Sequence, residues 1–538
     1  MSSLLTRRLA LLAEDGHRSL LQRGLRGIER EALRIDAGGH LALTPHPRVL
    51  GAALTHPQIT TDYSEAMLEL ITVPEHDTQK MLSQLEALHS FVVSRLGAEA
   101  LWSHSMPCRL PDEEEIPIAW YGSSHMGMLK HIYRRGLALR YGKAMQCIAG
   151  IHYNYSLAEE LWQTLKAAEA VPGSAMQFQS SSYVALIRNF RRYGWILLYL
   201  FGASPVVSAD FPGSSAGSLA SLSADTRYLP HATSLRMSDM GYKNDVRAGL
   251  TSDFNDLDTY ISNLAAALTE PHPKYAQLGT RRKGEMVQLN TNRLQIESEY
   301  YCSIRPKRVA RSGERPIQAL YARGIQYIEA RSLDINPFEP LGIELTTCYF
   351  LDAFLLFCAL EDSPPTGSEE ARENTANFSL MAREGRRPGL SLIRRGCEVS
   401  VKSCGLELLE RIQEVADLFD SKPGERVHTA AVAAQREKFM DADLTPSARV
   451  LREVREQNGS FMDFSLSLTA AHHDYLRTRR LTAEETSRFD ARVSDSLAEQ
   501  ERAERADQGD FEEFLLDYQA GIPGGFAAEE GSALLQSA

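Results

Sequence analysis

Gly27-Ile-Glu-Arg-Glu-Ala-Leu-Arg-Ile35 is the most informative segment of this sequence. It has the pattern of a strand, in which successive side chains point to opposite faces, so Glu29 and Glu31 share a face with the apolar Leu33 and Ile35. Carboxylates in such surroundings are costly unless a cation or a hydrogen-bond donor compensates their charge. The segment therefore predicts a strand that presents acidic side chains to a cation.

Two further segments repeat this arrangement of polar side chains two residues apart. They are Ile151-His-Tyr-Asn-Tyr155 and Tyr327-Ile-Glu-Ala-Arg-Ser-Leu-Asp-Ile335. In the first, His152 and Asn154 face together, and in the second, Glu329 and Arg331 do so. Three strands of one sheet could therefore bring polar groups to a common face.

A fourth segment, Ile59 to Ile71, adds Asp62 and Glu69 in a Thr-rich and then apolar setting. Across the four segments, the candidate ligands are oxygen donors and one imidazole, without thiolates. Such ligands suit Mg²⁺ or Mn²⁺, and several of these ions would fit a nucleotide phosphate chain. The implied partner is a magnesium-nucleotide complex.

Other readings of these residues remain open at this point. The carboxylates of the first segment could be strand-edge charges that pair with Arg30 and Arg34. The basic segments 188–195 and 304–308 could neutralise a triphosphate or form structural ion pairs. The sequence has neither a G-x-x-x-x-G-K-[ST] loop nor a G-x-G-x-x-G turn, so phosphates would have to be held in another way.

Composition indicates a folded, soluble protein. The chain has 538 residues, of which 43% are hydrophobic and 24% are charged, close to the globular average. Its formal net charge of −12 argues against general nucleic-acid binding, which needs a cationic surface. Seven scattered cysteines suggest a reducing cytosol, and the longest apolar stretch falls short of the roughly 20 residues that span a membrane. We expect a cytoplasmic protein without a membrane partner.

Hydrophobic periodicity predicts an α+β fold around an antiparallel or mixed sheet, because strands and helices do not alternate regularly. Residues 361–375 are expected to form a surface loop. Predicted helices lie at 78–96, 129–141, 181–200, 254–268, 350–360 and 406–419. The expected division is a catalytic domain at 1–400, a mainly helical region at 401–520 that packs on it, and a disordered tail at 521–538.

Several long motifs resemble those of one known family, the bacterial glutamate-cysteine ligases of the proteobacterial type. The similar stretches follow one another between positions 26 and 340, and beyond Ser400 the similarity rests mainly on LTPSARVL at 444–451. They are RGIEREALRID, LTHPQITTDYSEAMLELIT, GIHYNYS, IRNFRRYGW, YLFGASP, TSLRMSDMGY, LQIESEYYCSIRPKR and YIEARSLDINPFEP.

The resemblance implies a glutamine-synthetase-like fold, in which helices surround an antiparallel sheet curved into a funnel. It also implies that ATP drives the joining of the glutamate γ-carboxylate to the cysteine amine through γ-glutamyl phosphate, the first step of glutathione biosynthesis. Arg331 would meet the γ-phosphate, and Arg236 would lie near a substrate carboxylate. By resemblance, the ligands of two or three Mg²⁺ ions would be Glu29, Glu31, Asp62, Glu69, His152 and Glu329.

The resemblance further implies an aromatic and basic pocket for the acceptor substrate. Tyr63 stands where the family pattern has Phe, which adds a hydroxyl to this pocket. Its counterparts in this chain would be Tyr63, Tyr133, Arg134, Asn154, Tyr242 and Tyr301. We expect a monomer that glutathione inhibits. The alternatives are another ATP-dependent amine ligase or guanidino kinase with the same funnel, and a catalytically inactive metal- or nucleotide-binding protein.

Overall fold

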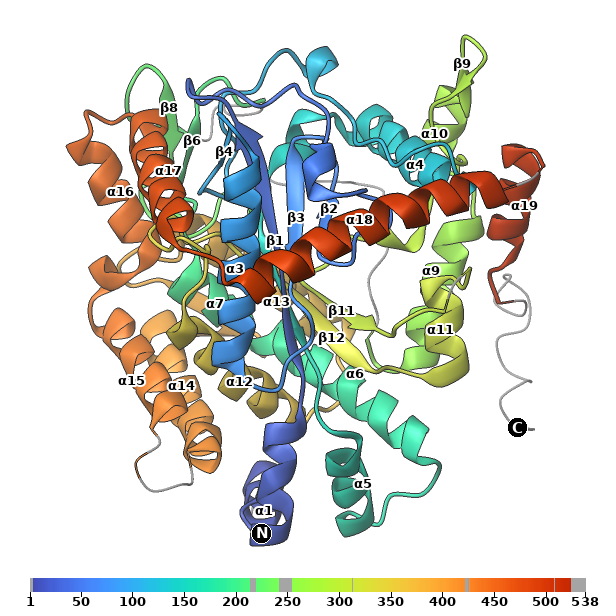
Figure 1. Ribbon diagram of the computed structural model, residues 1–538. Coiled ribbons are helices and arrows are strands. Elements are labelled where there is room, and N and C mark those ends of the chain that lie inside the picture. Colours follow the sequence, from blue (N-terminus) through green and yellow to red (C-terminus); the bar gives the residue numbers. More distant parts are fainter. Residues whose placement is uncertain are drawn as a thin grey trace.

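The centre of the protein is an antiparallel sheet, which Figure 1 shows in a computed structural model. The structure describes residues 3–212, 219–240, 254–311, 313–420, 424, 426–507 and 509–523. Within these residues the sheet has seven strands in the order β11-β12-β5-β1-β3-β2, and β4 pairs with β1. Its strands are β1 (Arg26–Ile35), β2 (Ile59–Thr61), β3 (Met67–Ile71), β4 (Ala100–Leu101), β5 (Ile151–Tyr155), β11 (Ile304–Lys307) and β12 (Tyr327–Leu333).

The strand register brings the four acidic segments of the sequence side by side. Glu31 of β1 lies opposite Glu69 of β3, and Glu29 of β1 lies opposite His152 of β5. Asn154 of β5 is in turn paired with Glu329 of β12. Because opposite residues in an antiparallel pair share a face, this register gathers the polar side chains on one face of the sheet. β11 and β12 turn away from the direction of β1, so the sheet is curved (Figure 1).

Helices cover the other face of the sheet. α3 contacts β1 and β3, α6 contacts β11 and β12, and α12 contacts both helices. α12 is buried on nearly all sides, as expected for a helix whose sequence is almost entirely apolar. The helices up to residue 384 are α1 (Leu4–Leu12), α2 (Asp15–Arg18), α3 (Thr78–Arg95), α4 (His125–Tyr141), α5 (Glu159–Ala168), α6 (Ala175–Tyr193), α7 (Trp195–Phe201), α9 (Leu257–Thr269), α10 (Pro273–Leu278), α11 (Pro316–Arg323), α12 (Leu345–Leu360) and α13 (Ser368–Glu384).

The last part of the described chain is helical. α14 and α15 pack on α12, α17 and α18 pack on α3, and α19 packs on α4. α18 crosses the front of the molecule and leads to α19 at its right-hand edge in Figure 1. These helices are α14 (Val401–Phe419), α15 (Val427–Met440), α16 (Pro446–Glu456), α17 (Phe461–Thr478), α18 (Ala483–Ala506) and α19 (Phe511–Ala520). The division at residue 400 stays a prediction, and residues 524–538 of the expected tail lie outside the described residues.

One small three-stranded sheet and two hairpins complete the described fold. They are formed by β6 (Val206–Ser208), β7 (Ala220–Ser221) and β8 (Thr226–Tyr228) in the order β6-β8-β7, by β9 (Arg281–Arg282) and β10 (Glu285–Met286), and by β13 (Ser391–Arg394) and β14 (Cys397–Ser400). The predicted loop at 361–375 is wrong in its second half, because α13 begins at Ser368. Glu369 and Glu370 lie in the first turn of α13, where negative side chains stabilise a helix.

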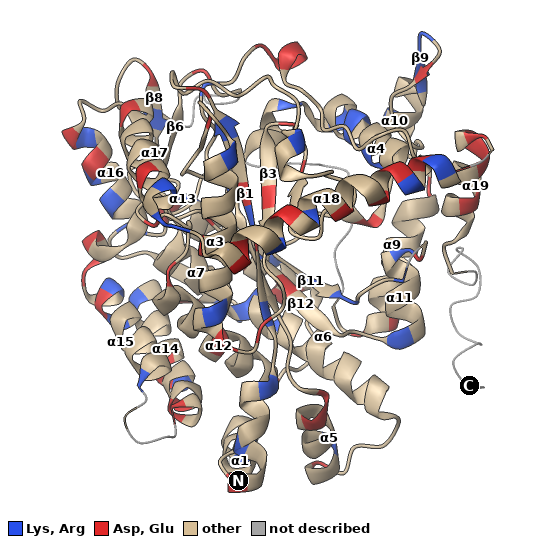
Figure 2. Ribbon diagram, viewed as in Figure 1, with Lys and Arg blue, Asp and Glu red and all other residues tan. Residues whose placement is uncertain are grey.

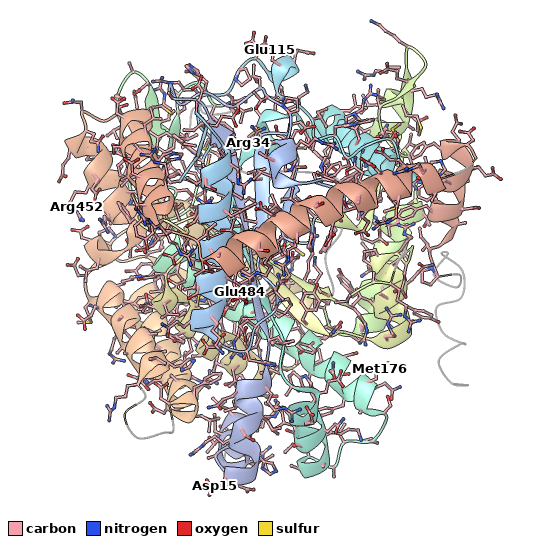
Figure 3. All side chains as sticks on the ribbon, in the orientation of Figure 1. Asp15, Arg34, Glu115, Met176, Arg452 and Glu484 are labelled. Atoms are coloured by element: carbon pink, nitrogen blue, oxygen red, sulfur yellow. The ribbon has the colours of Figure 1, made fainter. Side chains whose placement is uncertain are left out.

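Charged residues of both signs are distributed over the outer helices (Figure 2). Glu115, Met176 and Arg452 lie at the periphery, whereas the buried Arg34 lies close to the sheet (Figure 3). Among the helices that the structure describes, none combines the length and the apolar character needed to cross a bilayer.

Candidate active site

The polar face of the sheet forms the floor of a cavity of about 710 Å³. Side chains from β1, β3, β5, β11 and β12 line it, together with α4 and α19. Asn154 is not part of its wall, but its Nδ2 donates to Glu29 Oε1 at 2.8 Å. Tyr242 lies outside the described residues. The other sequence-predicted residues all line this cavity: Glu29, Glu31, Asp62, Tyr63, Glu69, Tyr133, Arg134, His152, Arg236, Tyr301, Glu329 and Arg331.

Three of the predicted metal ligands converge on one point. One ligand atom each from Glu29, His152 and Glu329 lies within 4.8 Å of the others. His152 Nδ1 is 3.1 Å from Glu29 Oε2 and 3.6 Å from Glu329 Oε1, while its Nε2 is 3.7 Å from Glu31 Oε1. The side chains of His152 and Glu329 are 5% and 1% exposed, so these groups meet in a site largely removed from water.

Burial disfavours the charged form of every carboxyl group here, and the neighbours decide which groups still ionise. Burial raises the pKa of Glu329, but Arg331, Lys307 and His152 outweigh it and hold that pKa well below its usual range. The pKa of Glu29 is also lowered despite burial, because His152 hydrogen-bonds it. These two carboxylates therefore remain charged at the centre of the site.

Glu31 and Glu69 show the opposite behaviour. Burial raises the pKa of Glu31, and burial together with Glu29, Asp62 and Glu31 raises the pKa of Glu69 well above its usual range. Glu31 Oε2 accepts a hydrogen bond from the Gly150 amide at 2.7 Å, which fixes its orientation. The cavity thus holds more carboxylates than the protein neutralises, and a cation is the natural compensation.

Two basic side chains contact the Glu329 carboxylate, one from β12 and one from β11. Arg331 NH1 lies 3.0 Å from Glu329 Oε1, and Lys307 Nζ lies 3.2 Å from Glu329 Oε2. The sequence predicted Arg331 but not Lys307, which stands at the end of β11 within the basic stretch 304–308. Lys130 of α4 also lines the cavity, and burial lowers its pKa to about 8. Nothing in the sequence indicated that Lys130 would line the cavity, because the residues around it have the pattern of an ordinary amphipathic helix.

The guanidinium of Arg236 lies beside β12. It donates to the backbone carbonyl oxygens of Leu333 and Arg331 at 3.2 and 2.9 Å, and its NH1 is 3.8 Å from the buried Asp334. A Cβ at Gly150 would collide with this guanidinium, so a larger residue there would displace Arg236 from its present position. Arg236 is therefore held rigidly at the cavity wall.

Aromatic side chains and one arginine form another wall. Arg134 lies with its guanidinium 4.6 Å from the ring centre of Tyr121, and its Nε donates to the backbone carbonyl of Asp62. Tyr63 and Tyr133 are buried, and the Tyr301 hydroxyl lies 3.4 Å from Met237 Sδ. This wall has the mixed apolar and basic character of a pocket for a small amino acid.

The alternative interpretation of Glu29 and Glu31, as strand-edge ion pairs, is wrong. Arg34 pairs with Glu99 and donates to Thr44 Oγ1 at 2.7 Å, and Arg30 NH1 meets His89 Nε2 at 3.1 Å. Both arginines are buried on the face opposite the two glutamates, as the strand alternation requires.

The donor set fits a hard divalent cation. Oxygen ligands from Glu29 and Glu329 with one imidazole from His152 are the types that Mg²⁺ and Mn²⁺ accept. The Asn154 Oδ1 atom is buried beside them and has no hydrogen-bond donor among the described residues. An unsatisfied acceptor next to an excess of carboxylates points to a cation or its water ligands at this place.

Comparisons with known proteins agree with this site. The family model for glutamate-cysteine ligase matches residues 9–381. Glutamate-cysteine ligases of Janthinobacterium sp. (strain Marseille) and Pseudomonas aeruginosa (strain UCBPP-PA14) are each 58% identical, over 97% of this chain and 99% of the relative. The crystal structure of glutamate-cysteine ligase from Francisella tularensis in complex with AMP superposes with a TM-score of 0.87 at 34% identity, covering 92% of this chain and 97% of that one.

A bifunctional glutathione synthetase from Pasteurella multocida superposes with a TM-score of 0.72 at 27% identity, covering 91% of this chain and 58% of that one.

The curved antiparallel sheet and its acidic cavity define an ATP-dependent ligase of glutamine-synthetase-like fold. The chain belongs to the glutamate-cysteine ligase family. It joins L-glutamate to L-cysteine with ATP as co-substrate and forms γ-glutamylcysteine, the first step of glutathione biosynthesis. The predicted family, fold class and activity are confirmed.

Proposed function

We propose that the cavity binds ATP through two or three Mg²⁺ ions, which Mn²⁺ can replace. Glu29, Glu31, Asp62, Glu69, His152 and Glu329 are the proposed ligands. The observation that carries this proposal is the convergence of Glu29, His152 and Glu329 within 4.8 Å, although they are far apart in the sequence. When bound, the ions would screen the charge of the phosphate chain and of the glutamate carboxylate.

Arg331 is the proposed partner of the phosphoryl group in transfer. Its contact with Glu329 holds the guanidinium next to the converging side chains of Glu29, His152 and Glu329. A fixed positive charge at that place stabilises the negative charge that spreads over the phosphoryl oxygens. The γ-carboxylate of glutamate would attack the γ-phosphate and give γ-glutamyl phosphate with release of ADP. Arg236 would hold a substrate carboxylate from the neighbouring wall.

The aromatic wall is the proposed acceptor pocket. The cysteine amine would attack the acyl carbon of γ-glutamyl phosphate and release inorganic phosphate. The carboxylate of cysteine could pair with Arg134, whose guanidinium lies on the Tyr121 ring beside Asp62. The proposed substrate contacts are Tyr63, Tyr133, Arg134, Asn154, Tyr242 and Tyr301. The Tyr63 hydroxyl distinguishes this pocket from one built with Phe.

Further parts of the proposal concern the whole protein. Glutathione would inhibit because it contains the γ-glutamylcysteine portion that the cavity must accommodate. Seven unpaired cysteines favour a reducing compartment, the cytoplasm. A monomer is proposed because one chain supplies all the walls described for the cavity. The proposed division into a catalytic part, 1–400, and a helical part, 401–520, is supported by the start of α14 at Val401.

Binding of Mn²⁺, followed by electron paramagnetic resonance in the presence of ATP, tests the metal assignment. Replacement of Glu29 by Gln removes one ligand charge at constant shape, and we expect at least about a tenfold loss of Mn²⁺ affinity. The exposed Glu115, replaced by Gln, is the matched control and should leave the affinity unchanged. Equal affinities of both variants would contradict the assignment. Trapping with hydroxylamine in the absence of cysteine tests the intermediate, because γ-glutamyl phosphate should yield γ-glutamyl hydroxamate.

A further inference from the structure

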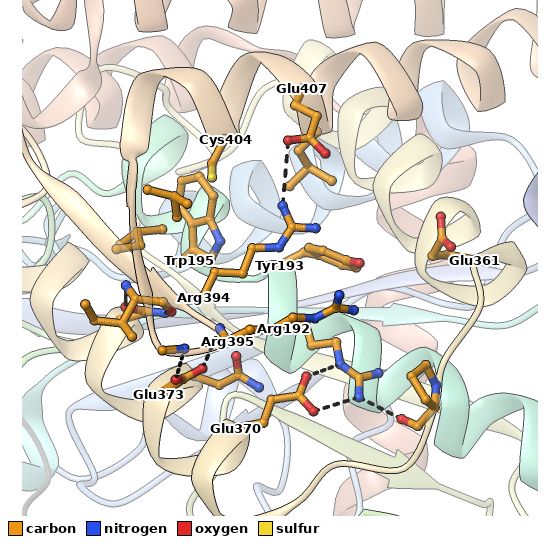
Figure 4. A pocket seen from close by; sticks show the side chains of 18 of the residues that line it. Arg192, Tyr193, Trp195, Glu361, Glu370, Glu373, Arg394, Arg395, Cys404 and Glu407 are labelled. Atoms are coloured by element: carbon orange, nitrogen blue, oxygen red, sulfur yellow. Dashed lines mark hydrogen bonds and ion pairs between the residues drawn. The ribbon is translucent and has the colours of Figure 1, made fainter.

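A second cavity of about 580 Å³ lies outside the catalytic one. Its walls come from the end of α6, from residues 361–364, and from α13, the β13–β14 hairpin and α14 (Figure 4). Among the residues that the structure describes, none lines both cavities. Neither the predicted site residues nor the proposed reaction uses this second cavity.

Three of the carboxylates that line this second cavity are bound by groups of the protein itself. Glu370 accepts from Arg192 Nε at 2.6 Å and from its NH2 at 3.2 Å. Glu373 accepts from the Arg395 and Gly396 amides at 3.0 and 2.8 Å, as the dashed lines in Figure 4 show. Glu361 is buried, accepts from the Asp362 amide at 2.8 Å and pairs with Arg411. These three carboxylates are therefore occupied, whereas Asp362 and Glu369, which also line the cavity, are exposed to solvent.

The guanidinium groups, in contrast, keep donors available. Arg395 has no side-chain partner among the described residues. Arg411 pairs with Glu361 and lies 5.1 Å from the Phe357 ring centre, and Arg394 is a loose 3.6 Å from Glu407. A guanidinium has five N–H donors, so these contacts leave most of them unused. The indole of Trp195, buried and facing the cavity in Figure 4, adds a flat apolar surface.

We propose that this cavity is a binding site for a small dicarboxylate, whose two carboxylates are held by Arg394, Arg395 and Arg411 and whose carbon chain contacts Trp195. Guanidinium groups recognise carboxylates in a bidentate manner, and three of them provide enough donors for two such groups. One dicarboxylate is the product of the enzyme itself, γ-glutamylcysteine. Another candidate ligand is a metabolite with two carboxylates joined by a short carbon chain, as in glutarate.

The position of α13 gives this site a connection to catalysis. Glu370, Glu373 and Asn377 of α13 line the second cavity. At the other end of the helix, the carbonyl oxygen of Ala382 accepts from the amides of Thr233 and Ser234 at 2.9 and 3.1 Å. The segment that α13 anchors in this way leads directly to Arg236 of the catalytic cavity. Binding in the second cavity should therefore change the turnover number.

Alkylation of Cys404 reports directly on the cavity. Cys404 of α14 lines it and is half-buried, whereas Cys397 of the adjoining β13–β14 hairpin is exposed and lies outside the lining. Burial raises the pKa of the Cys404 thiol, so the reaction with iodoacetamide is best followed at alkaline pH by peptide mass spectrometry. With glutarate at ten times its dissociation constant, we expect about tenfold slower alkylation of Cys404 and an unchanged rate at Cys397. The same arm with γ-glutamyl-2-aminobutyrate, an analogue of the product without the thiol and therefore inert to iodoacetamide, decides whether the γ-glutamyl dipeptide binds more tightly than a plain dicarboxylate.

Two substitutions test whether the Arg395 guanidinium binds the dicarboxylate. Arg395 has φ of +54°, a conformation that Asn tolerates well, so Arg395→Asn removes the guanidinium without strain. This variant should lose the protection of Cys404, whereas Arg372→Gln, at an exposed position of α13 outside the lining, should keep it. Equal protection in wild type and Arg395→Asn, equal slowing at Cys397, or no protection by either probe would each overturn the proposal. The readout does not depend on catalysis, so its failure leaves the proposed metal site untouched.

Kinetics test the connection to Arg236. At saturating glutamate, glutarate should lower kcat of the wild-type enzyme and should not lower kcat of Arg395→Asn. Inhibition that is purely competitive with glutamate, and equal in both proteins, would overturn this connection.

Discussion

Two groups of buried charged side chains lie on opposite faces of the same strands. The first group, which we call the cation cluster because its side chains are the proposed ligands of cations, comprises Glu29, Glu31, Glu69, His152 and Glu329. The Asp352 network comprises Arg26, Thr78, Tyr153, Asp352 and His428. Arg26 and Glu29 are both on β1, and Tyr153 and His152 are neighbours on β5, so strand alternation alone sends one set to the cavity and the other towards α12.

The Asp352 network is neutralised within the chain. Arg26 Nε donates to the two oxygens of Asp352 at 3.0 and 3.1 Å. Thr78 Oγ1 and the Tyr153 hydroxyl donate to the same carboxylate at 3.0 and 2.9 Å. His428 Nε2 is 3.9 Å away and connects the network to Asp420 through its Nδ1 at 2.9 Å. No external ligand is needed to satisfy Asp352.

The cation cluster has a different balance. Its carboxylates outnumber the cations that contact them, Arg331 and Lys307, and the raised pKa values of Glu31 and Glu69 record the excess. A buried set that is satisfied internally stabilises the fold, whereas a buried set with uncompensated charge has to be completed by a ligand. The comparison thus separates a structural network from a binding site by charge balance rather than by burial.

The largest expected effect is on catalysis, from Glu329→Gln. This change removes one ligand charge from the cation cluster at constant shape. We expect kcat to fall on the order of 10³-fold, the upper range for loss of one preorganised electrostatic group. ADP release with saturating glutamate, cysteine and Mg²⁺ is the measurement. Circular dichroism should show an unchanged fold, and near-normal turnover would remove Glu329 from the cluster.

The corresponding substitution in the Asp352 network is Asp352→Asn. Because it leaves Arg26 buried without its counter-charge, we expect a loss of roughly 3 kcal/mol in the free energy of unfolding. Thermal unfolding would show this as a lowered Tm. The kcat of the folded fraction should stay within a few-fold of the wild-type value. A stable but inactive variant would show that the two groups are not separable in this way.

Addition of Mg²⁺ should distinguish the two groups directly. A ligand that binds only the folded state stabilises it by about 2.7 kcal/mol at a concentration one hundred times its dissociation constant. We expect Mg²⁺ with ATP to raise the Tm of the wild type and of Asp352→Asn, and to raise that of Glu329→Gln much less. Differential scanning fluorimetry measures the shifts. An equal shift in all three proteins would mean that the cation binds elsewhere.

Period-two patterns allowed most of the cation cluster to be predicted from the sequence, because strand alternation is local. The helices at 78–96 and 350–360 were also predictable, and α3 and α12 confirm them. The loop expected at 361–375 failed because the acidic residues that suggested a solvated loop also favour the first turn of α13.

The Asp352 network could not be predicted, since Arg26 and Asp352 are separated by 326 residues. A single Asp within an apolar helix indicates that a buried cationic side chain must lie opposite its carboxylate. It does not indicate which Arg, Lys or His of the chain supplies that side chain. Lys307 and the second cavity were missed for the same reason. Their neighbours come together only through tertiary packing, which leaves no periodic trace in the sequence.

The smallest expected effect is the pH dependence of stability. Burial raises the pKa of Asp352, but Arg26 and His428 outweigh it, so the pKa lies below its ordinary value in the folded protein. The unfolded chain then binds more protons at low pH, and the stabilisation by Asp352 is complete above about pH 4 and is lost as the pH falls below it. The difference in Tm between wild type and Asp352→Asn should therefore shrink in that range. Glu115→Gln, which changes an exposed carboxylate, should give a curve parallel to the wild type. If the Asp352→Asn curve were also parallel down to about pH 3, the ionised Asp352 would not be what stabilises this network, and the contrast with the cation cluster would have to rest on packing instead.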